Sequence, residues 1–407
     1  MDSLTQITLG AACGEVVLGK KIGNRAMLWG ALGGYLPDFD IMANFVTDEM
    51  TALAFHRSIT HSLLFGVVAP FGLAWLIHQL YSRGIYKKKA YRAGSTLFWL
   101  LFVIGVFNFV PYMVTNMVNY GVLTWTLVIG SVVYLLFWKF YVKNEAWPVK
   151  ATYWDWYWLF FLSVFTHPLL DSCTAYGTQL FQPFSDYRVA LNNISVVDPI
   201  YTLPFLICVI VTSMLLRNSP KRRFFNYLGI GLSTAYLLFT FYNKSKVNTV
   251  FENSLAEQGI EYNRYMTAPT IFNNVLWHCI AEGDSVYYQG LYSLRDEEPR
   301  IAVWNKFPKN HELIKDYEAE RSIKILKWFS NGYYNIIHRE DGRLQFNDLR
   351  FGIFGDKAIS ENDYIFHFIL EEENGKIEAH QSRERPDMKE NFGQLWTRIK
   401  GLPAGTE

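Results

Sequence analysis

Long apolar runs fill the chain up to about residue 242 and do not recur beyond it. A helix needs about 20 apolar residues to cross a bilayer, and six runs come close to this length: 62–81, 94–113, 121–138, 154–171, 200–216 and 224–242. Helices satisfy their backbone hydrogen bonds internally in lipid. Half of all residues are hydrophobic and 17% are aromatic, which is heavy for a soluble protein. The runs therefore predict an all-α polytopic membrane domain over 1–242.

Two further apolar segments, 7–19 and 27–46, precede these six. The first is too short to span a bilayer alone. The second is interrupted by Pro37, Asp38 and Asp40, which would be costly on a lipid-facing helix. We expect this segment to break there and to pack against protein. The expected total is about six to eight membrane helices.

From residue 243 the hydrophobic runs shorten and charged residues become frequent. Apolar residues alternate as in half-buried strands, and a helical spacing covers roughly 311–329. The alternating stretches are 286–292, 333–338, 349–354 and 364–370. The pattern predicts a soluble α+β domain with an antiparallel sheet over 243–390 and a disordered tail over 391–407.

Cationic residues gather in alternate loops between the apolar runs, and by the positive-inside rule those loops are cytoplasmic. The remaining connections and the domain after 243 are then expected on the outer face of the membrane. The cationic loops contain Lys20, Lys21 and Arg25; Arg83, Lys87, Lys88, Lys89 and Arg92; Lys139, Lys143 and Lys150; and Arg217, Lys221, Arg222 and Arg223.

The end of the run 154–171 holds a histidine and a carboxylate. His167 and Asp171 are four residues apart, so on a helix they share one face. Ionisable groups in an apolar segment need compensation, and a shared metal ion or mutual pairing provides it. The alternative is structural: a hydrogen-bonded histidine near a helix end, and an aspartate that caps it.

Two more histidines, His56 and His61, flank a second polar stretch. They are five residues apart and would not be neighbours on a helix, but a loop leading into a helix would let them converge. Ser58 and Thr60 are expected to cap the following helix. Arg57 is a natural ligand for a phosphate or carboxylate group.

The third polar stretch follows Pro37. Asp38 and Asp40 would point the same way in an extended segment, where they repel each other unless a cation lies between them. We expect at least one of them to bind a metal, although an Asp-rich turn would also explain them. Asp2 and Asp198 are weaker candidates, since each could simply cap a helix.

Imidazoles and carboxylates without thiolates fit Zn²⁺, with Mn²⁺ or Fe²⁺ as alternatives, and the number of donors allows one or two ions. Such a site suits phosphoester hydrolysis. The four cysteines are far apart in the sequence and are expected as buried free thiols. No basic aromatic patch suggests nucleic-acid binding. No P-loop, nucleophile elbow or dinucleotide fingerprint argues for another chemistry.

Four motifs in order resemble the YdjM-type inner-membrane proteins, a family of membrane-bound metal-dependent hydrolases grouped distantly with zinc phospholipase C and P1 nuclease. The motifs are 1–10, 34–40, 56–62 and 166–171, and the resemblance covers roughly 1–242. It implies metal roles for Asp38 or Asp40, His56, His61, His167 and Asp171. Two departures argue against a three-metal site. Gln6 stands where some relatives have histidine, and a second His-x-x-x-Glu/Asp pair is missing.

The sequence therefore predicts an integral membrane hydrolase acting on a phosphoester of a lipid or an envelope precursor. The expected metal ligands are Asp38, His56, His61, His167 and Asp171, and the expected catalytic residues are Asp40 and Arg57. The alternative is a non-enzymatic membrane protein with a structural metal site and a partner-binding outer domain. Transport has less support, because the two halves show no matching pair of broken helices.

Overall fold

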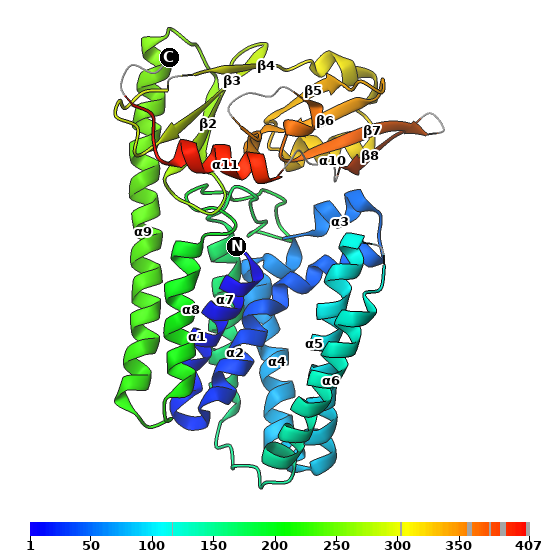
Figure 1. Ribbon diagram of the computed structural model, residues 1–407, viewed down its shortest axis with the longest axis vertical. Coiled ribbons are helices and arrows are strands. Elements are labelled where there is room, and N and C mark those ends of the chain that lie inside the picture. The colour runs from blue at the N-terminus through cyan, green and yellow to red at the C-terminus, as the bar shows by residue number, and fades with distance from the viewer. Residues whose placement is uncertain (116, 302, 356–359, 374–375, 383–387, 404–407) are drawn as a thin grey trace. The chain divides into compact units, whose positions relative to one another are not determined.

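The computed structural model describes residues 1–115, 117–301, 303–355, 360–373, 376–382 and 388–403 (Figure 1). Most of the described residues up to 257 are helical, as the apolar runs predict up to 242, and the longest non-helical segment is 172–198. The helices are α1 (Ser3–Ile22), α2 (Asn24–Tyr35), η1 (Leu36–Phe45), α3 (Glu49–Phe55), η2 (Ile59–His61), α4 (Leu63–Ser82), η3 (Ile85–Lys87), α5 (Lys89–Thr115), α6 (Tyr120–Phe137), η4 (Trp138–Val142), α7 (Tyr153–Asp171), α8 (Pro199–Met214) and α9 (Pro220–Glu257).

Three helical stretches within the described residues are long and apolar enough to cross a membrane: Leu63–Ser82, Tyr120–Val142 and Pro220–Glu257. The expected count of six to eight spans is not supported. Helix α8 is apolar but has only 16 residues. Helix α7 begins with a run of Trp and Tyr residues and ends with a histidine and an aspartate, which lower its mean hydropathy.

The break expected in the segment 27–46 is confirmed. Helix α2 ends at Tyr35, and the chain continues as the 3-10 helix η1, with a proline in its first turn. Proline has no backbone N–H to continue an α-helix. The two acidic residues of this segment therefore lie outside α-helical backbone.

Helices α1 and α2 pack with their backbones in contact at glycines. A Cβ atom added to Gly10 would lie 2.3 Å from the carbonyl oxygen of Gly30, and one added to Gly30 would lie 2.2 Å from that of Gly10. Close backbone approach through small residues is the common way to pack helices in membranes. It holds the start of α1 against the end of α2.

A buried ion pair joins α1 to α9. Arg222 donates from Nε to Glu15 Oε1 at 2.7 Å and from Nη2 to Glu15 Oε2 at 2.6 Å. Its Nη1 donates to Asn24 Oδ1 and to the carbonyl of Leu215. One guanidinium thus links α1, α2, α9 and the chain just after α8.

Residues 71–158 form a compact unit of their own, and residues 1–70 with 159–407 form the other. In the smaller unit, Asn108 Nδ2 on α5 donates to Thr126 Oγ1 on α6 at 2.9 Å. The Arg92 guanidinium lies 4.3 Å from the ring centre of Tyr141. The candidate site and the C-terminal domain belong to the larger unit.

The C-terminal domain contains two antiparallel sheets, each with its strands in chain order. The first comprises β1 (Arg264–Pro269), β2 (Leu276–Glu282), β3 (Val286–Ser293) and β4 (Asn305–Pro308). The second comprises β5 (Tyr334–His338), β6 (Leu344–Asp348), β7 (His367–Glu373) and β8 (Lys376–Gln381). The remaining elements are η5 (His311–Tyr317), α10 (Arg321–Phe329), η6 (Leu349–Phe351), η7 (Glu361–Asp363) and α11 (Met388–Ile399). The predicted α+β class of this part is confirmed.

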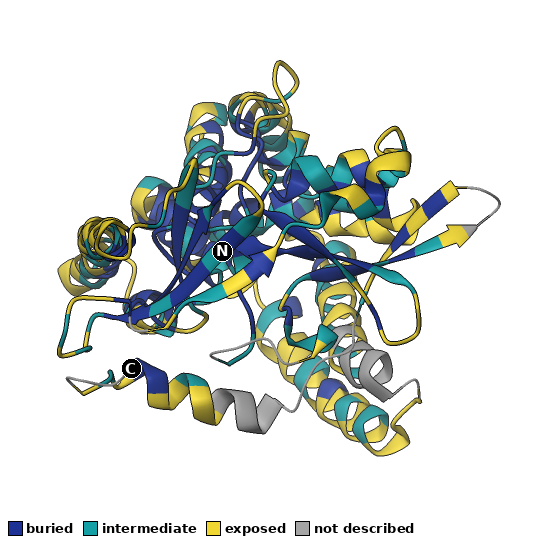
Figure 2. Ribbon diagram, turned by 90° about the horizontal axis from the view of Figure 1, so that it is seen from above, coloured by how far each residue is buried: buried dark blue, intermediate teal, exposed yellow. Residues whose placement is uncertain are grey.

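Buried side chains concentrate on the central strands of both sheets (Figure 2). The last turns of α9 pack on the first sheet, where Phe251 and Leu255 join Trp277 in one apolar cluster. Helix α10 packs on the second sheet, where Ile323 and Leu326 join the cluster around the β-strands. All four cysteines are free and buried, as expected from their spacing.

Local details of this domain differ from the predictions. The stretch 311–329 is two helices, because Glu320 takes an extended conformation (φ −67°, ψ 142°) and begins α10 separately. Residues 349–351 form the 3-10 helix η6 rather than a strand. Part of the expected disordered tail is helix α11, whose Arg398 pairs with Asp296 at 2.6 Å and whose Ile399 is buried.

Candidate metal centre

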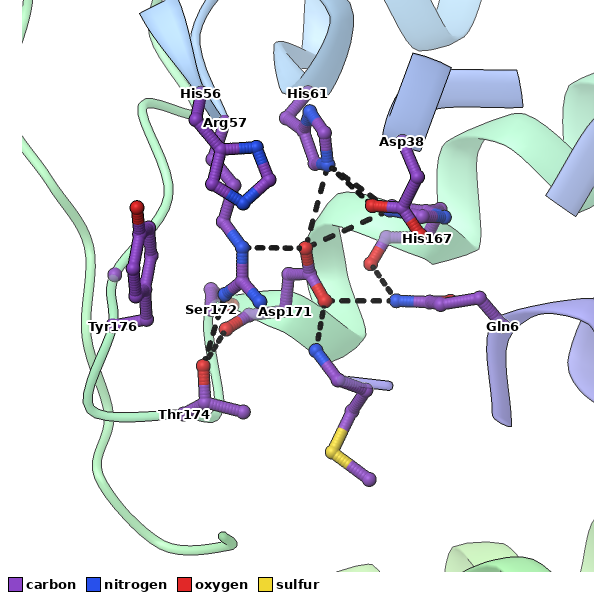
Figure 3. Close-up of polar contacts among 12 residues, drawn as sticks. Gln6, Asp38, His56, Arg57, His61, His167, Asp171, Ser172, Thr174 and Tyr176 are labelled. Carbon is purple, nitrogen blue, oxygen red and sulfur yellow. Dashed lines mark hydrogen bonds and ion pairs between the residues drawn. The ribbon is translucent and has the colours of Figure 1, made fainter. Parts of the chain in front are cut away.

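Four side chains from three separate stretches converge in the larger unit (Figure 3). Asp38 comes from η1, His61 from η2, and His167 and Asp171 from the last turn of α7. One ligand atom from each lies within 4.8 Å of the other three. The three polar stretches singled out in the sequence thus meet in space.

The donor atoms are closely spaced. Nε2 of His61 lies 3.1 Å from Nε2 of His167, and Asp38 Oδ1 lies 3.5 and 3.4 Å from these two nitrogens. Asp171 Oδ2 lies 3.5 and 3.6 Å from the same two nitrogens. A regular tetrahedron with metal–ligand distances of about 2.1 Å has edges of about 3.4 Å. Five of the six donor separations match this value.

Burial and hydrogen bonding also fit a cation at this position. The side chains of His61, His167 and Asp171 are fully buried, while that of Asp38 is 15% exposed. Oδ2 of Asp171 is buried and accepts no hydrogen bond in the structure. Arg57 Nε lies 3.2 Å from this oxygen, but a buried carboxylate oxygen that accepts no hydrogen bond is costly. A metal ion bound by these four groups would satisfy it.

The second ring nitrogen of His61 and of His167 has a partner outside the cluster. Nδ1 of His61 lies 3.2 Å from Asp40 Oδ2, and Nδ1 of His167 donates to the carbonyl of Gly34 at 2.5 Å. These contacts turn both Nε2 atoms toward the cluster. Metal-ligating histidines characteristically donate their second ring N–H to a carboxylate or carbonyl, which fixes the tautomer and the ring orientation.

The carbonyl of Gly34 is available because of the change from α2 to η1. In an α-helix the carbonyl of Gly34 would accept the N–H of residue 38. In a 3-10 helix its partner would be residue 37, which is a proline and has no N–H. The carbonyl near the end of α2 can therefore accept from His167. The proline that breaks the helix thus helps to build the site.

Asp40 lies behind the cluster rather than in it. Its Oδ1 lies 2.9 Å from Nδ1 of His56, and its Oδ2 accepts the backbone N–H of Arg57 at 2.8 Å. Burial raises the pKa of Asp40, but hydrogen bonds from His56 and His61 outweigh it and hold the pKa below its ordinary value. The carboxylate stays ionised and organises the turn between the two histidines.

His56 is not one of the four clustered residues. Its side chain is 28% exposed, and its ring centre lies 6.2 Å from that of His61. The two histidines converge on the same carboxylate, Asp40, and not on one metal position. The metal role expected for His56 is not supported by this arrangement.

Arg57 lies beside the cluster in a left-handed backbone conformation (φ 59°). Its Nε is 3.2 Å from Asp171 Oδ2, and its Nη1 donates to Thr174 Oγ1 at 3.0 Å. The guanidinium also lies 4.7 Å from the ring centre of Tyr176. Arg57 is thus held next to the metal position, where it could contact an anionic ligand.

Several contacting residues were not identified from the sequence. Gln6 Nε2 donates to Asp171 Oδ1 at 2.9 Å, and the Met1 amino group pairs with the same oxygen. Tyr176 and Thr174, in the loop after α7, contact Arg57. In the sequence, the family resemblance alone points to position 6, because some relatives have histidine there.

The expected caps are partly confirmed. Asp2 accepts the N–H of Thr5 at the start of α1, and Asp198 accepts N–H groups at the start of α8. Thr60 instead donates to Asp40, and Ser62 accepts the N–H of Phe65 at the start of α4. Of the polar residues before α4, Thr60 therefore contacts a residue of the site, and Ser62 caps the helix.

Comparison with known proteins agrees with the sequence motifs. The family model described as YdjM inner membrane protein matches residues 1–116 and 121–247. Neither the curated proteins nor the solved structures provide a match. The matched residues include all four members of the cluster. The chain belongs to the YdjM inner membrane protein family.

Proposed function

We propose that this protein is a multi-pass hydrolase of the bacterial inner membrane that binds one divalent metal ion and cleaves a phosphoester. The ligands would be Asp38, His61, His167 and Asp171. The observation that carries the proposal is the near-tetrahedral spacing of their four donor atoms, at 3.1–3.6 Å in five of six separations. Zn²⁺ suits two imidazoles and two carboxylates, and Mn²⁺ or Fe²⁺ would accept the same set.

A divalent ion held here supplies Lewis acidity and lowers the pKa of a water molecule. The Arg57 guanidinium lies against Asp171, one of the proposed metal ligands. In this proposal it donates hydrogen bonds to the non-bridging oxygens of a phosphate bound at the metal position. The sequence resemblance to a group that includes zinc phospholipase C and P1 nuclease supports a phosphoester. A lipid or envelope precursor remains the substrate class that we propose.

Proton transfer is assigned to His56. Asp40 holds its Nδ1 at 2.9 Å, which leaves Nε2 to take up or deliver a proton, and the side chain is partly exposed. In this assignment Asp40 is a positioning residue and not a catalytic one, and His56 is a catalytic residue and not a metal ligand.

Orientation and domain organisation are part of the proposal. The distribution of cationic loops supports a location of the site and the C-terminal domain outside the cytoplasm. We retain 1–242 as the membrane-embedded domain and 243–390 as the extracytoplasmic domain. The rings of Trp328 and Phe329 on α10 lie over Arg188 in the loop after α7, which supports a role for the C-terminal domain near the site.

The second candidate function is non-enzymatic, with a structural metal ion. Four protein donors can complete a tetrahedral shell, which is the rule for structural zinc sites, whereas catalytic sites keep a position open. The partial exposure of Asp38 favours the hydrolase, because solvent reaches the cluster there.

Elemental analysis of the detergent-purified protein tests the metal site. About one zinc or manganese per chain is expected in the wild type and in a His338→Ala control, and a loss in His167→Ala. His338 is exposed and lies at the end of β5, away from the cluster. A well-folded wild type that takes up no metal after incubation with zinc, manganese or iron would overturn both candidates.

The two candidates are separated by hydrolysis of bis(p-nitrophenyl) phosphate by the metal-loaded protein. The hydrolase requires turnover that falls at least 100-fold in Arg57→Met while the metal content is retained. A structural site predicts no turnover in the wild type and unfolding when the metal is removed.

A further inference from the structure

Arg188 is a buried cation that the metal centre does not use. It lies in the loop between α7 and α8, and its side chain is almost fully enclosed. Its Nη2 donates to the carbonyls of Tyr176 and Gly177 at 3.1 and 3.0 Å. Its Nη1 is buried and has no hydrogen-bond partner in the structure. One arm of the guanidinium is therefore left without an acceptor.

Aromatic rings from two parts of the chain surround this guanidinium. Its Cζ lies 5.0 Å from the ring centre of Tyr176, and 5.3 and 4.9 Å from those of Trp328 and Phe329 on α10. Aromatic faces attract a cation through their quadrupole. They do not supply the negative charge that would neutralise it.

Other buried arginines of the same unit have a carboxylate partner. Arg57 lies against Asp171, Arg222 against Glu15 and Arg350 against Asp348. Within the described residues Arg188 makes no such ion pair. Burial lowers the pKa of Arg188 to about 9, which still leaves the guanidinium protonated at neutral pH. A buried charge of this kind normally requires a counter-ion.

Two other guanidinium groups lie near Arg188, each paired with its own carboxylate. After burial, the charges of Arg350 and Arg57 lower the pKa of Arg188, whereas that of Asp348 raises it. The ring of Tyr176 contacts the guanidiniums of both Arg57 and Arg188, at 4.7 and 5.0 Å. The cation therefore lies one aromatic ring away from the arginine of the candidate metal centre.

We propose that Arg188 is the main ligand of an anion subsite beside the candidate metal centre, and that the anion is a phosphate group. A phosphate group carries the negative charge that the Arg188 guanidinium lacks, and arginine binds it through its planar fork. Because Nη1 is buried, entry of the anion requires the rings of Trp328 and Phe329 to move away from Arg188. The subsite requires no hydrolytic activity and goes beyond the proposed function.

The test uses the full-length, detergent-purified protein after treatment with a chelator, so that no metal contributes to anion binding. The thermal unfolding midpoint is measured against rising inorganic phosphate, with sodium chloride at matched ionic strength as the baseline. We expect the midpoint of the wild type to rise and that of Arg188→Gln to stay level, corresponding to at least tenfold weaker binding.

Arg264→Gln is the matched control. Arg264 also lies over an aromatic ring, 4.1 Å from the centre of Tyr333, but it pairs with Glu282 at 2.5 Å. The rise in midpoint with phosphate should persist in this variant. If Arg188→Gln does not fold, Arg188→Lys serves in its place. Lysine keeps the positive charge but lacks the planar guanidinium group. We therefore expect a clearly smaller rise of the unfolding midpoint with phosphate.

Short-chain phosphatidic acid, used below its micellar concentration, distinguishes a lipid headgroup from a free anion. A rise with both probes indicates a free phosphate group, and a rise with the lipid alone indicates a headgroup. An equal rise in Arg188→Gln and the wild type would overturn the proposal, as would no rise with either probe. Metal content is measured separately, so a failed subsite and a failed hydrolase give different results.

Discussion

The carboxylate of Asp40 lies 3.2 Å from Nδ1 of His61, on the side of the ring that faces away from the candidate metal centre. Asp40→Asn keeps the shape of this side chain but removes its charge. We expect metal affinity to fall by about 10- to 100-fold, as is typical when an orienting carboxylate is lost. Competition with a coloured chelator measures the affinity. Asp186→Asn, in the loop after α7, is the control, and equal affinities in the two variants would argue against the orienting role.

The contact between Gly10 and Gly30 leaves no space for a methyl group. Gly30→Ala should push α1 and α2 apart and destabilise the protein by about 1–3 kcal/mol, the usual cost of overpacking. Because the carbonyl of Gly34 on α2 holds His167, metal affinity should fall as well. Gly231→Ala on α9 is the control, since an added Cβ there meets nothing within 4 Å. Denaturant unfolding in detergent gives the stability, and equal effects of the two substitutions would contradict the prediction.

For the buried pair of Glu15 and Arg222, we expect a single variant to be less stable than the double variant. Glu15→Leu leaves the guanidinium buried without its carboxylate and should destabilise the protein by about 3–5 kcal/mol. Glu15→Leu combined with Arg222→Met removes both charges and should recover most of that loss. Unfolding midpoints of the wild type and of these two variants test the prediction. A double variant as unstable as the single one would show that Arg222 acts mainly through its other hydrogen bonds.

His278 links the stability of the C-terminal domain to pH. It is buried on β2, and its Nε2 donates to the carbonyl of Arg350 at 2.6 Å. Burial lowers its pKa below the ordinary value of 6.5. The unfolded chain therefore binds a proton near pH 6.5 that the folded chain does not, and stability contributed by this group is lost as pH falls below that value.

His278→Gln should flatten the fall of the unfolding midpoint between about pH 7.5 and 5.5. The control is His338→Gln, because His338 is exposed at the end of β5. Its pH dependence should match that of the wild type. If His278→Gln and the wild type show the same slope, other groups govern the acid sensitivity.

The helical region could be predicted from the sequence because it depends on local patterns. The meeting of the polar stretches could be predicted because the alternation of cationic loops puts all three on the same side of the membrane. Residues four apart on a helix, such as His167 and Asp171, fix their own geometry. The break at Pro37 follows from its missing N–H. The class of the C-terminal domain follows from the alternation of its side chains.

The division of roles among the site residues could not be predicted, because it depends on contacts between distant segments. One residue separates Asp40 from Asp38, yet only Asp38 reaches the cluster, because η1 is a 3-10 helix and not an extended segment. Arg188 gave no signal in the sequence, since its surroundings come from α10, far along the chain. The predicted count of six to eight spans rests on apolar length, and within the described residues three helical stretches have the length and hydropathy of a span.

Helix α9 runs for 38 residues without interruption, from Pro220 to Glu257. Its later turns present Val247, Phe251 and Leu255, four residues apart, to the first sheet. Each residue turns an α-helix by about 100°, so one inserted residue near 243 would rotate these three side chains away from their cluster. Seven inserted residues, about two turns, would nearly restore the angle. One continuous helix connects the helical region to the first sheet. The packing of these three side chains therefore restricts the number of residues that α9 can have near 243.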